Sequence, residues 1–244
     1  MSDENDTQGS GTNLFGIKPL AKSVEIATQG AVDMATALIE RICFPAAKEI
    51  GLVLKDKVHA YRTKQLISVV QKADEKMKAN GVTTEMHASP RIVNPILENS
   101  SWIDDTVVQD LWAGLLASSC TDQGDDDSNL MFINILSNLT KLQSRILKEA
   151  CERSQKISHM DGLIHAHWLR MPVDQLKELV GETDMQRLDR ELDHLFGLSL
   201  LKGSLQPGGS VNLTPTPLAL HMYVRCQGSR KSPVEFFEIP ATQS

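Results

Sequence analysis

Aromatic residues are scarce in this 244-residue chain, where they make up 5% of the sequence. A chain of this length can form one large or two small domains, and a core of that size needs many buried side chains. With few rings available, the core has to be built from Leu, Ile, Val, Ala and Met. That composition suits helices, so we expect a mainly α-helical protein.

Cysteines are also few and lie far apart, and no two of them form a C-x-x-C pair. This spacing argues against a disulfide framework and against a zinc knuckle. A reducing compartment fits the pattern better, and we therefore expect a cytoplasmic protein with free thiols. The four cysteines are Cys43, Cys120, Cys151 and Cys226.

Long apolar runs are missing as well. No segment offers the roughly 18 uncharged apolar residues that a membrane-spanning helix needs. The first residues, MSDENDTQGSGTN, are polar and acidic, which is the opposite of a secretory signal. We expect residues 1–13 to be disordered.

The chain has no excess of positive charge: it contains 25 Lys and Arg and 31 Asp and Glu, which gives a net charge of -6. This balance disfavours a general nucleic-acid binder. The sequence also lacks G-x-S-x-G, a Gly-rich phosphate loop and H-E-x-x-H. We therefore expect no enzyme, and assign no catalytic, cofactor-binding or metal-binding residue and no cofactor.

The stretch 90–119 organises the chain and predicts two helices joined by a tight acidic turn. Asp104 or Asp105 is placed to cap the second helix. Behind this cap, apolar residues recur at helical spacing, which predicts a central core helix packed on more than one side. Ala113, Gly114 and Ala117 are small, so another helix can approach closely. The apolar stripe consists of Val107, Val108, Leu111, Trp112, Leu115 and Leu116.

Two further helices are predicted before this stretch. The first covers Leu14–Phe44 and either packs on the body or a second subunit, or touches a membrane. Its polar face is not lysine-rich, which weakens the membrane alternative. The second starts near Pro45 and is stopped by Asn80-Gly81.

Charges of opposite sign occupy neighbouring segments. Lys and Arg dominate 41–81, whereas 98–127 carries eight acids and no Lys or Arg. Two such segments can steer their own packing within the chain or pair one subunit with another. For the basic segment 41–81 two further interpretations are open: a solvated face, or a docking face for an acidic partner or a phosphate group. The loop TDQGDDDSN lacks the residue order of a calcium loop. We expect Asp127 or Ser128 to cap the following helix, LMFINILSNLT.

The last third combines strands and helices. After a helix from Thr140 or Ser144 to about Ser154, GLIHAHWLRMP predicts one strand. Helices follow at 173–180 and 183–196, then a hairpin turning at QPGG, then a helix at 217–226. This order is typical of a winged helix-turn-helix module. Its second helix is rich in acids, so protein contact or dimerisation is favoured over DNA reading.

One cluster of potential ligands accompanies the predicted strand. His165 and His167 would face the same side, with His159 and Asp161 nearby. Metal sites can be built in this way, but the spacing matches no zinc pattern. We interpret these histidines as surface or half-buried side chains.

Together these patterns predict a mainly α protein, with a helical N-terminal and central domain followed by a winged-helix-like α+β C-terminal module. The expected divisions are a disordered tail at 1–13, a helical domain at 14–139 and the winged-helix-like module at 140–227. A loose tail at 228–244 follows, in which Phe236, Phe237 and Ile239 can dock as an arm.

An ordered series of short motifs resembles the Abi-alpha family of bacterial abortive-infection proteins. The series is PAAKEIGLVLKDKVHAYRTKQ, LISVVQKADEKMKANG, PRIVNPILENSSWIDDTVVQDLWAGLLASS and FINILSNLTKLQSRILKEAC. The resemblance covers roughly 44–151, with weaker agreement to residue 226. It implies a role in phage defence and supplies no catalytic residues.

We therefore expect a phage-defence protein that acts through protein contacts, with itself as a homo-oligomer or with a phage or host protein. A winged-helix transcriptional regulator is one alternative. A membrane-acting effector that uses Leu14–Phe44 is the other.

Overall fold

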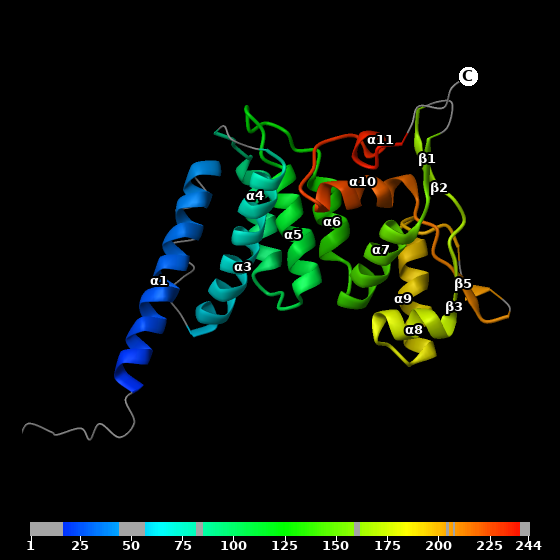
Figure 1. The fold of residues 1–244 in the computed structure, drawn as a ribbon, viewed down its shortest axis with the longest axis horizontal. Coiled ribbons are helices and arrows are strands. Elements are labelled where there is room, and N and C mark those ends of the chain that lie inside the picture. Colours follow the sequence, from blue (N-terminus) through cyan, green and yellow to red (C-terminus); the bar gives the residue numbers. More distant parts are fainter. Residues whose placement is uncertain are drawn as a thin grey trace, which may run out of the picture.

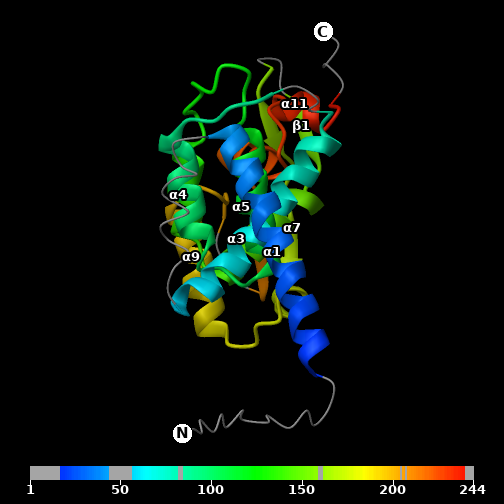
Figure 2. The same cartoon turned by 90° about the vertical axis from the view of Figure 1, so that its left-hand side faces the viewer.

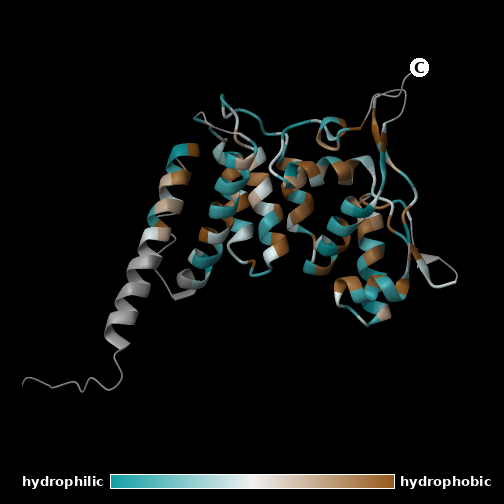
Figure 3. Ribbon diagram, in the orientation of Figure 1, coloured by the Kyte–Doolittle hydropathy of each residue, from teal (hydrophilic) through white to brown (hydrophobic). Residues whose placement is uncertain are grey.

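The computed structural model describes residues 17–43, 57–81, 85–158, 162–203, 205–206 and 208–239, and in 17–29, 57–60 and 205–206 it describes the backbone alone. Its described part is mainly helical, with small antiparallel strand pairs toward the C-terminal end (Figure 1). Figure 3 shows hydrophobic and hydrophilic colours alternating along the helices, as one-sided burial requires.

Two helices form the N-terminal flank of the molecule. The first is α1 (Ile17–Ile42), which packs along α3 (Lys57–Ala79) at the edge of the body (Figures 1 and 2). Leu38, Ile39 and Ile42 are buried. The first predicted helix is thus confirmed over 17–42, whereas the predicted start at Pro45 lies outside the described residues. The predicted stop is confirmed by Gly81, whose φ of 73° is favourable for glycine.

The central pair of helices follows the sequence pattern closely. Pro90 opens α4 (Pro90–Ser100), and Asp105 caps α5 (Thr106–Ser118) by accepting the backbone N–H groups of Val107 and Val108 at 3.0 and 3.1 Å. Such a cap is worth about 0.5–2 kcal/mol. The helix α5 packs against α3, α4, α6 (Leu130–Ser137), α7 (Lys141–Arg153) and α10 (Pro217–Cys226). Trp112 at its middle is fully buried. The prediction of a core helix packed on several sides is confirmed.

Small residues on α5 allow another helix to approach it closely. A Cβ atom on Gly114 would lie 1.6 Å from the carbonyl oxygen of Cys226, at the end of α10 (Pro217–Cys226). No side chain fits in that space, so glycine is required there. The expected close approach is therefore confirmed, and the two residues that meet, Gly114 and Cys226, are 112 positions apart in the chain.

The prediction that Asp127 or Ser128 caps α6 (Leu130–Ser137) is wrong. Asn129 precedes this helix and its side chain makes no hydrogen bond to the first turn. Its amide group instead donates to Ser118 Oγ at 3.0 Å and to Ser119 Oγ at 2.8 Å, and so closes the end of α5. Asp127 is engaged by Arg91 at 3.0 Å. The tertiary contacts of these side chains outweigh the local cap.

The next helix, α7 (Lys141–Arg153), begins as predicted. Thr140 and Gln143 form a capping box, in which each side chain accepts a hydrogen bond from the other residue's backbone N–H. The helix ends at Ser154, also as predicted.

The predicted single strand in 162–172 is two strands in different sheets. The first, β2 (Ile164–Ala166), pairs antiparallel with β1 (Lys156–Ser158), which the sequence pattern did not indicate. The second, β3 (Arg170–Pro172), pairs with β5 (Ser210–Asn212), and β5 also pairs with β4 (Leu205–Gln206). The stretch 162–172 therefore passes from one sheet to the other at 167–169, between its pairing with β1 and its pairing with β5. The helices α8 (Val173–Val180) and α9 (Met185–Gly197) lie between β3 and β4 in the chain and match the predicted helices.

The segment after α10 returns to the body through α11 (Pro233–Phe236). The Phe237 ring stacks on Tyr223 with 6.1 Å between ring centroids, and Lys156 Nζ lies 4.6 Å from the centre of the same ring. Ile239 packs against the core, whereas 240–244 lies outside the described residues. This part of the expected loose tail therefore docks as an arm.

We expect Gly114→Ala to destabilise the protein by about 3 kcal/mol or more, because α5 and α10 would have to separate. Chemical denaturation followed by circular dichroism measures this loss. Gly197→Ala is the matched control: no atom lies within 4 Å of the added carbon, and its stability should stay equal or rise by up to about 1 kcal/mol. Equal stabilities of the two variants would contradict the close approach.

Candidate interaction surface

The acidic and basic segments of the sequence pair within the molecule. Arg62 lies 2.6 Å from Glu98, and Lys76 lies 3.1 Å from Asp110, so α3 is joined to α4 and α5. Further pairs are Arg91–Asp127, Lys141–Asp104 and Arg145–Asp105. Exposed ion pairs of this kind add little stability individually, but they fix how the helices align. Only the Arg62–Glu98 and Lys76–Asp110 pairs join the basic segment 41–81 to the acidic segment 98–127, and these two agree with the expectation that the segments steer their own packing.

One of these pairs holds a tryptophan at the surface. Trp102 follows α4 and is 52% exposed, yet the Arg62 guanidinium lies 4.4 Å from its ring centre. Its indole nitrogen donates to Glu98 Oε1 at 3.3 Å, while Glu98 Oε2 accepts from Arg62 at 2.6 Å. Arg62 Nε also donates to Ser101 Oγ at 2.9 Å. The exposed ring is therefore held in one orientation by charged and polar neighbours.

We name this feature the Trp102 surface and define it by Tyr61, Arg62, Glu98 and Trp102. Tyr61 precedes Arg62 on α3 and is 44% exposed. Charged groups and large aromatic side chains lie close together here, and aromatic residues and arginine are enriched at protein interfaces. No sequence pattern marked this tryptophan as a contact residue. Its position among acids and after a helix end was visible, but its partner Arg62 lies 40 residues earlier.

The charge of Glu98 depends on this arrangement. Partial burial works to raise the pKa of its carboxyl group, but the hydrogen bonds from Arg62 and Trp102, and the charge of Arg62, outweigh that effect. The pKa consequently lies below its usual value of 4.5. Glu98 is therefore ionised at neutral pH, where it can keep both partners in place.

The predicted ligand cluster is only partly described. His159 and Asp161 lie outside the described residues, whereas His165 is on β2 and His167 follows it. His165 is half-buried opposite Ile157 in the hairpin, and His167 is exposed. In the part of the chain that the structure describes, no group of three potential ligands is placed to hold a metal ion.

The acidic loop is held by hydrogen bonds between its own backbone N–H groups and side-chain oxygens. Thr121 Oγ1 accepts the N–H of Gly124 at 2.8 Å, and Asp126 Oδ1 accepts the N–H of Ser128 at 2.9 Å. The hydrogen bonds from Ser128 lower the pKa of Asp126. Since Asp127 pairs with Arg91, its carboxylate already has a cation beside it.

All four cysteines are buried thiols outside any disulfide bond. Burial raises the pKa of the thiols of Cys120 and Cys151 to about 12, and that of Cys226 also rises. Thiols with such pKa values stay protonated at neutral pH and are poor nucleophiles.

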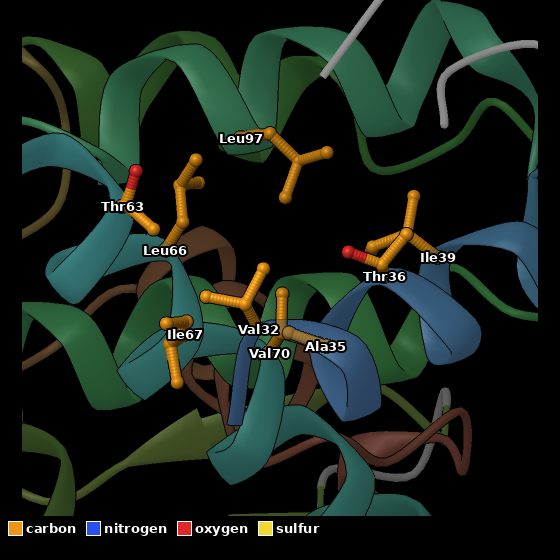
Figure 4. A pocket seen from close by; sticks show the side chains of 9 residues that line it. All are labelled: Val32, Ala35, Thr36, Ile39, Thr63, Leu66, Ile67, Val70 and Leu97. Atoms are coloured by element: carbon orange, nitrogen blue, oxygen red, sulfur yellow. The ribbon is translucent and has the colours of Figure 1, made fainter. Parts of the chain in front are cut away.

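A small apolar cleft lies between α1, α3 and α4 (Figure 4). It has a volume of about 30 Å³, which leaves room for little more than a water molecule. A larger open groove of about 390 Å³ lies on another side of α1, between Met34, Leu38 and Val70. The apolar side chains Leu38, Ile39 and Ile42 that a membrane would take up are packed on the body instead.

The helix α9, which is the second helix of the predicted winged-helix-like module, is nearly neutral at its surface. Arg187 and Arg190 are exposed, and so are Asp189 and Asp193. Arg187 lies 2.9 Å from Glu182, so this pair already neutralises one positive charge. A surface of this kind offers phosphates no net attraction.

Comparison with known proteins identifies the family. The family model described as abortive infection alpha matches residues 60–208, which is more than half of the chain. The chain belongs to the abortive infection alpha family. Neither a curated protein nor a solved structure matches it.

Membership of the abortive infection alpha family links this protein to abortive infection, a form of phage defence. The match begins within α3 and ends in the turn between β4 and β5. It starts later than the expected resemblance at 44, and it continues well beyond 151. The Trp102 surface lies inside the matched region, whereas α1, α10 and α11 lie outside it.

A membrane-spanning helix is not found in this family member: in the described part of the chain, no helix combines the required length and apolar character.

We expect the Trp102 indole N–H to report the ionisation of Glu98. Because the folded-state pKa of Glu98 is lowered, the linkage is intact above pH 4.5 and is lost as the pH falls through that lower value. The Trp102 indole resonance in ¹H–¹⁵N NMR spectra should therefore shift at a midpoint below 4.5. Arg62→Met should move the midpoint upward.

Trp168 provides the control for this titration, because it is 73% exposed and its indole has no carboxylate partner among the described residues. Its resonance should not follow the same transition. A Trp102 midpoint that Arg62→Met leaves unchanged would contradict the proposed linkage.

Proposed function

We propose that this protein serves phage defence as a non-catalytic interaction protein, and that it binds a protein partner through the Trp102 surface. The carrying observation is that Trp102 is half exposed yet fixed by Arg62 and Glu98. Tryptophan and arginine are the residues most often found at the energetic centre of protein interfaces. An anchor that is already ordered loses less conformational entropy on binding.

The family match supports the role in phage defence, and the exposed, ordered ring of Trp102 supports protein binding as the mode of action. The partner is a second copy of the chain, in a homo-oligomer, or a phage or host protein in the cytoplasm. No bond is made or broken in this mechanism: binding changes which proteins are held together during infection.

We expect Trp102→Ala to abolish phage protection while leaving the fold intact, because the lost side chain is half exposed. Plaque counts on a phage-sensitive host that expresses each variant measure protection, and melting temperatures of the purified proteins measure the fold. Trp168→Ala is the matched control, since it removes an exposed tryptophan from another part of the chain. If Trp102→Ala protected as well as the unmodified protein, the Trp102 surface would not be the contact.

A second proposal concerns the segment from α7 to α10. The antiparallel sheet order β3-β5-β4, with α8 and α9 inserted after β3 and α7 before it, supports a winged-helix-like module. Such modules read DNA when their second helix is positively charged. The balanced charges on α9 favour protein contact or dimerisation instead.

We expect no mobility shift of duplex DNA by the full-length protein, even at low salt, where phosphate contacts are strongest. A shift that weakens steeply with salt and is lost in Arg190→Ala would instead establish the regulator alternative, because Arg190 is exposed on α9.

A further inference from the structure

A groove runs between α1 and α3 on the outer flank of the molecule. Its volume of about 390 Å³ is far above the roughly 10–15 Å³ that one water molecule needs. Figure 2 shows this flank facing the viewer, with α1 in front of the body. We name the feature the α1–α3 groove and define it by Met34, Leu38, Arg41, Val70, Asp74 and Lys78.

Helix α1 carries two rows of side chains at helical spacing. The inward row packs against the rest of the protein, and Leu38, Ile39 and Ile42 in it are buried. The outward row is exposed, and its residues follow one another at intervals of four, three and four positions. Helices that pack along one another present side chains at this spacing. The outward row therefore has the spacing of a second packing face, and it consists of Gly30, Met34, Ala37 and Arg41.

The outward row and the groove beside it fit another helix. Met34 is 62% exposed, and Ala37, nearly one turn further along α1, is exposed and small enough to let a second helix approach closely. Of the residues that line the groove, Leu38 and Val70 are buried, whereas Lys78 is exposed. An apolar centre with a polar rim is typical of protein interfaces, and a helix that lies in a groove is a common mode of recognition.

The charges of α1 and of the groove favour a second copy of the chain as this helix. Asp74 lies 3.6 Å from Arg41 and 2.6 Å from Lys78, so two cations share one carboxylate and this end of the groove keeps a positive excess. Asp33 is exposed near the other end of the outward row. Asp33 and Arg41 lie four residues on either side of Ala37, about 6 Å along the helix.

Only one orientation of the second copy brings opposite charges together. If two α1 helices cross antiparallel at Ala37, Asp33 of each copy comes to Arg41 of the other. A parallel crossing would place Arg41 beside Arg41, and like charges in contact are unfavourable.

We propose that the α1–α3 groove is the interface of an antiparallel homodimer, in which Met34 of each copy enters the groove of the other. The interface is isologous: each copy contributes the same residues, and the assembly closes at two chains. Helices α1 and α3 of both copies then pack as a four-helix bundle.

This interface goes beyond the proposed function, because it uses other residues than the Trp102 surface. Arg62 and Val70 are eight residues apart on α3, which corresponds to about 12 Å along the helix. The dimer therefore leaves the Trp102 surface available for a phage or host protein.

Sedimentation velocity of the full chain over a wide range of concentrations tests the dimer. We expect a species of twice the 26.9 kDa of one chain. Met34→Glu should raise the dimer dissociation constant by about a hundredfold or more, because each dimer would bury two unpaired carboxylates. Met34 is exposed within one chain and Glu is a good helix former, so far-UV circular dichroism should stay unchanged.

Met131→Glu is the matched control, since it makes the same change at a methionine of α6 that is 49% exposed. Its dissociation constant should equal that of the unmodified protein. A monomer at every concentration would overturn the proposal, and so would equal weakening by Met34→Glu and Met131→Glu.

A charge exchange tests the orientation. Arg41→Glu should weaken the dimer by about tenfold, because the new carboxylate would face Asp33 of the second copy. Combining it with Asp33→Arg should restore the affinity, since opposite charges then meet again. A double variant as weak as Arg41→Glu alone would contradict the antiparallel crossing.

Trp102→Ala separates this proposal from the proposed function. A stable dimer of this variant that no longer protects against phage would support both. A Trp102→Ala protein that is monomeric would overturn the α1–α3 interface and assign self-association to the Trp102 surface. A monomeric unmodified protein that binds phospholipid vesicles, and does so less in Met34→Glu, would overturn it in favour of a membrane contact.

Discussion

The close approach of α5 and α10 is the constraint on which the rest of the fold depends. Gly114 lets the Cys226 carbonyl sit where a side chain would otherwise be. Around this contact α5 is enclosed by α3, α4, α6, α7 and α10, and Trp112 is fully buried. Helix–helix packing normally keeps axes 8–10 Å apart, and small residues set the lower end of that range. The C-terminal part of the chain is thereby anchored to its middle.

Charge provides the second level of organisation. The basic helix α3 is paired with the acidic segment 98–127 within the same molecule, through Arg62–Glu98 and Lys76–Asp110. Individually these pairs are weak, but together they fix the helix alignment that apolar packing leaves less specific. The locked Trp102 is a by-product of one such pair, because Arg62 contacts Glu98 and the indole ring at once.

The family-matched region and the parts outside it have different roles in this picture. Residues 60–208 contain the helical centre, the Trp102 surface and the strands β1 to β4. Outside them, α1 covers one flank, α10 completes the core and α11 folds back through Phe237. A defence role shared with the family fits a surface inside the match.

Local chemistry determined the elements that the sequence predicted well. The Asp105 cap, the Thr140–Gln143 box and the stop at Gly81 use residues within four positions of one another, so their structure follows from neighbours in the chain. The apolar stripe of α5 likewise predicted its burial.

Tertiary contacts decided what the sequence could not. Asn129 turns back to α5, the stretch 162–172 divides between two sheets, and Trp102 is held by a residue 40 positions away. Each outcome depends on which distant segment lies opposite. Sequence spacing carries little information about that choice, because it is made only when the helices pack.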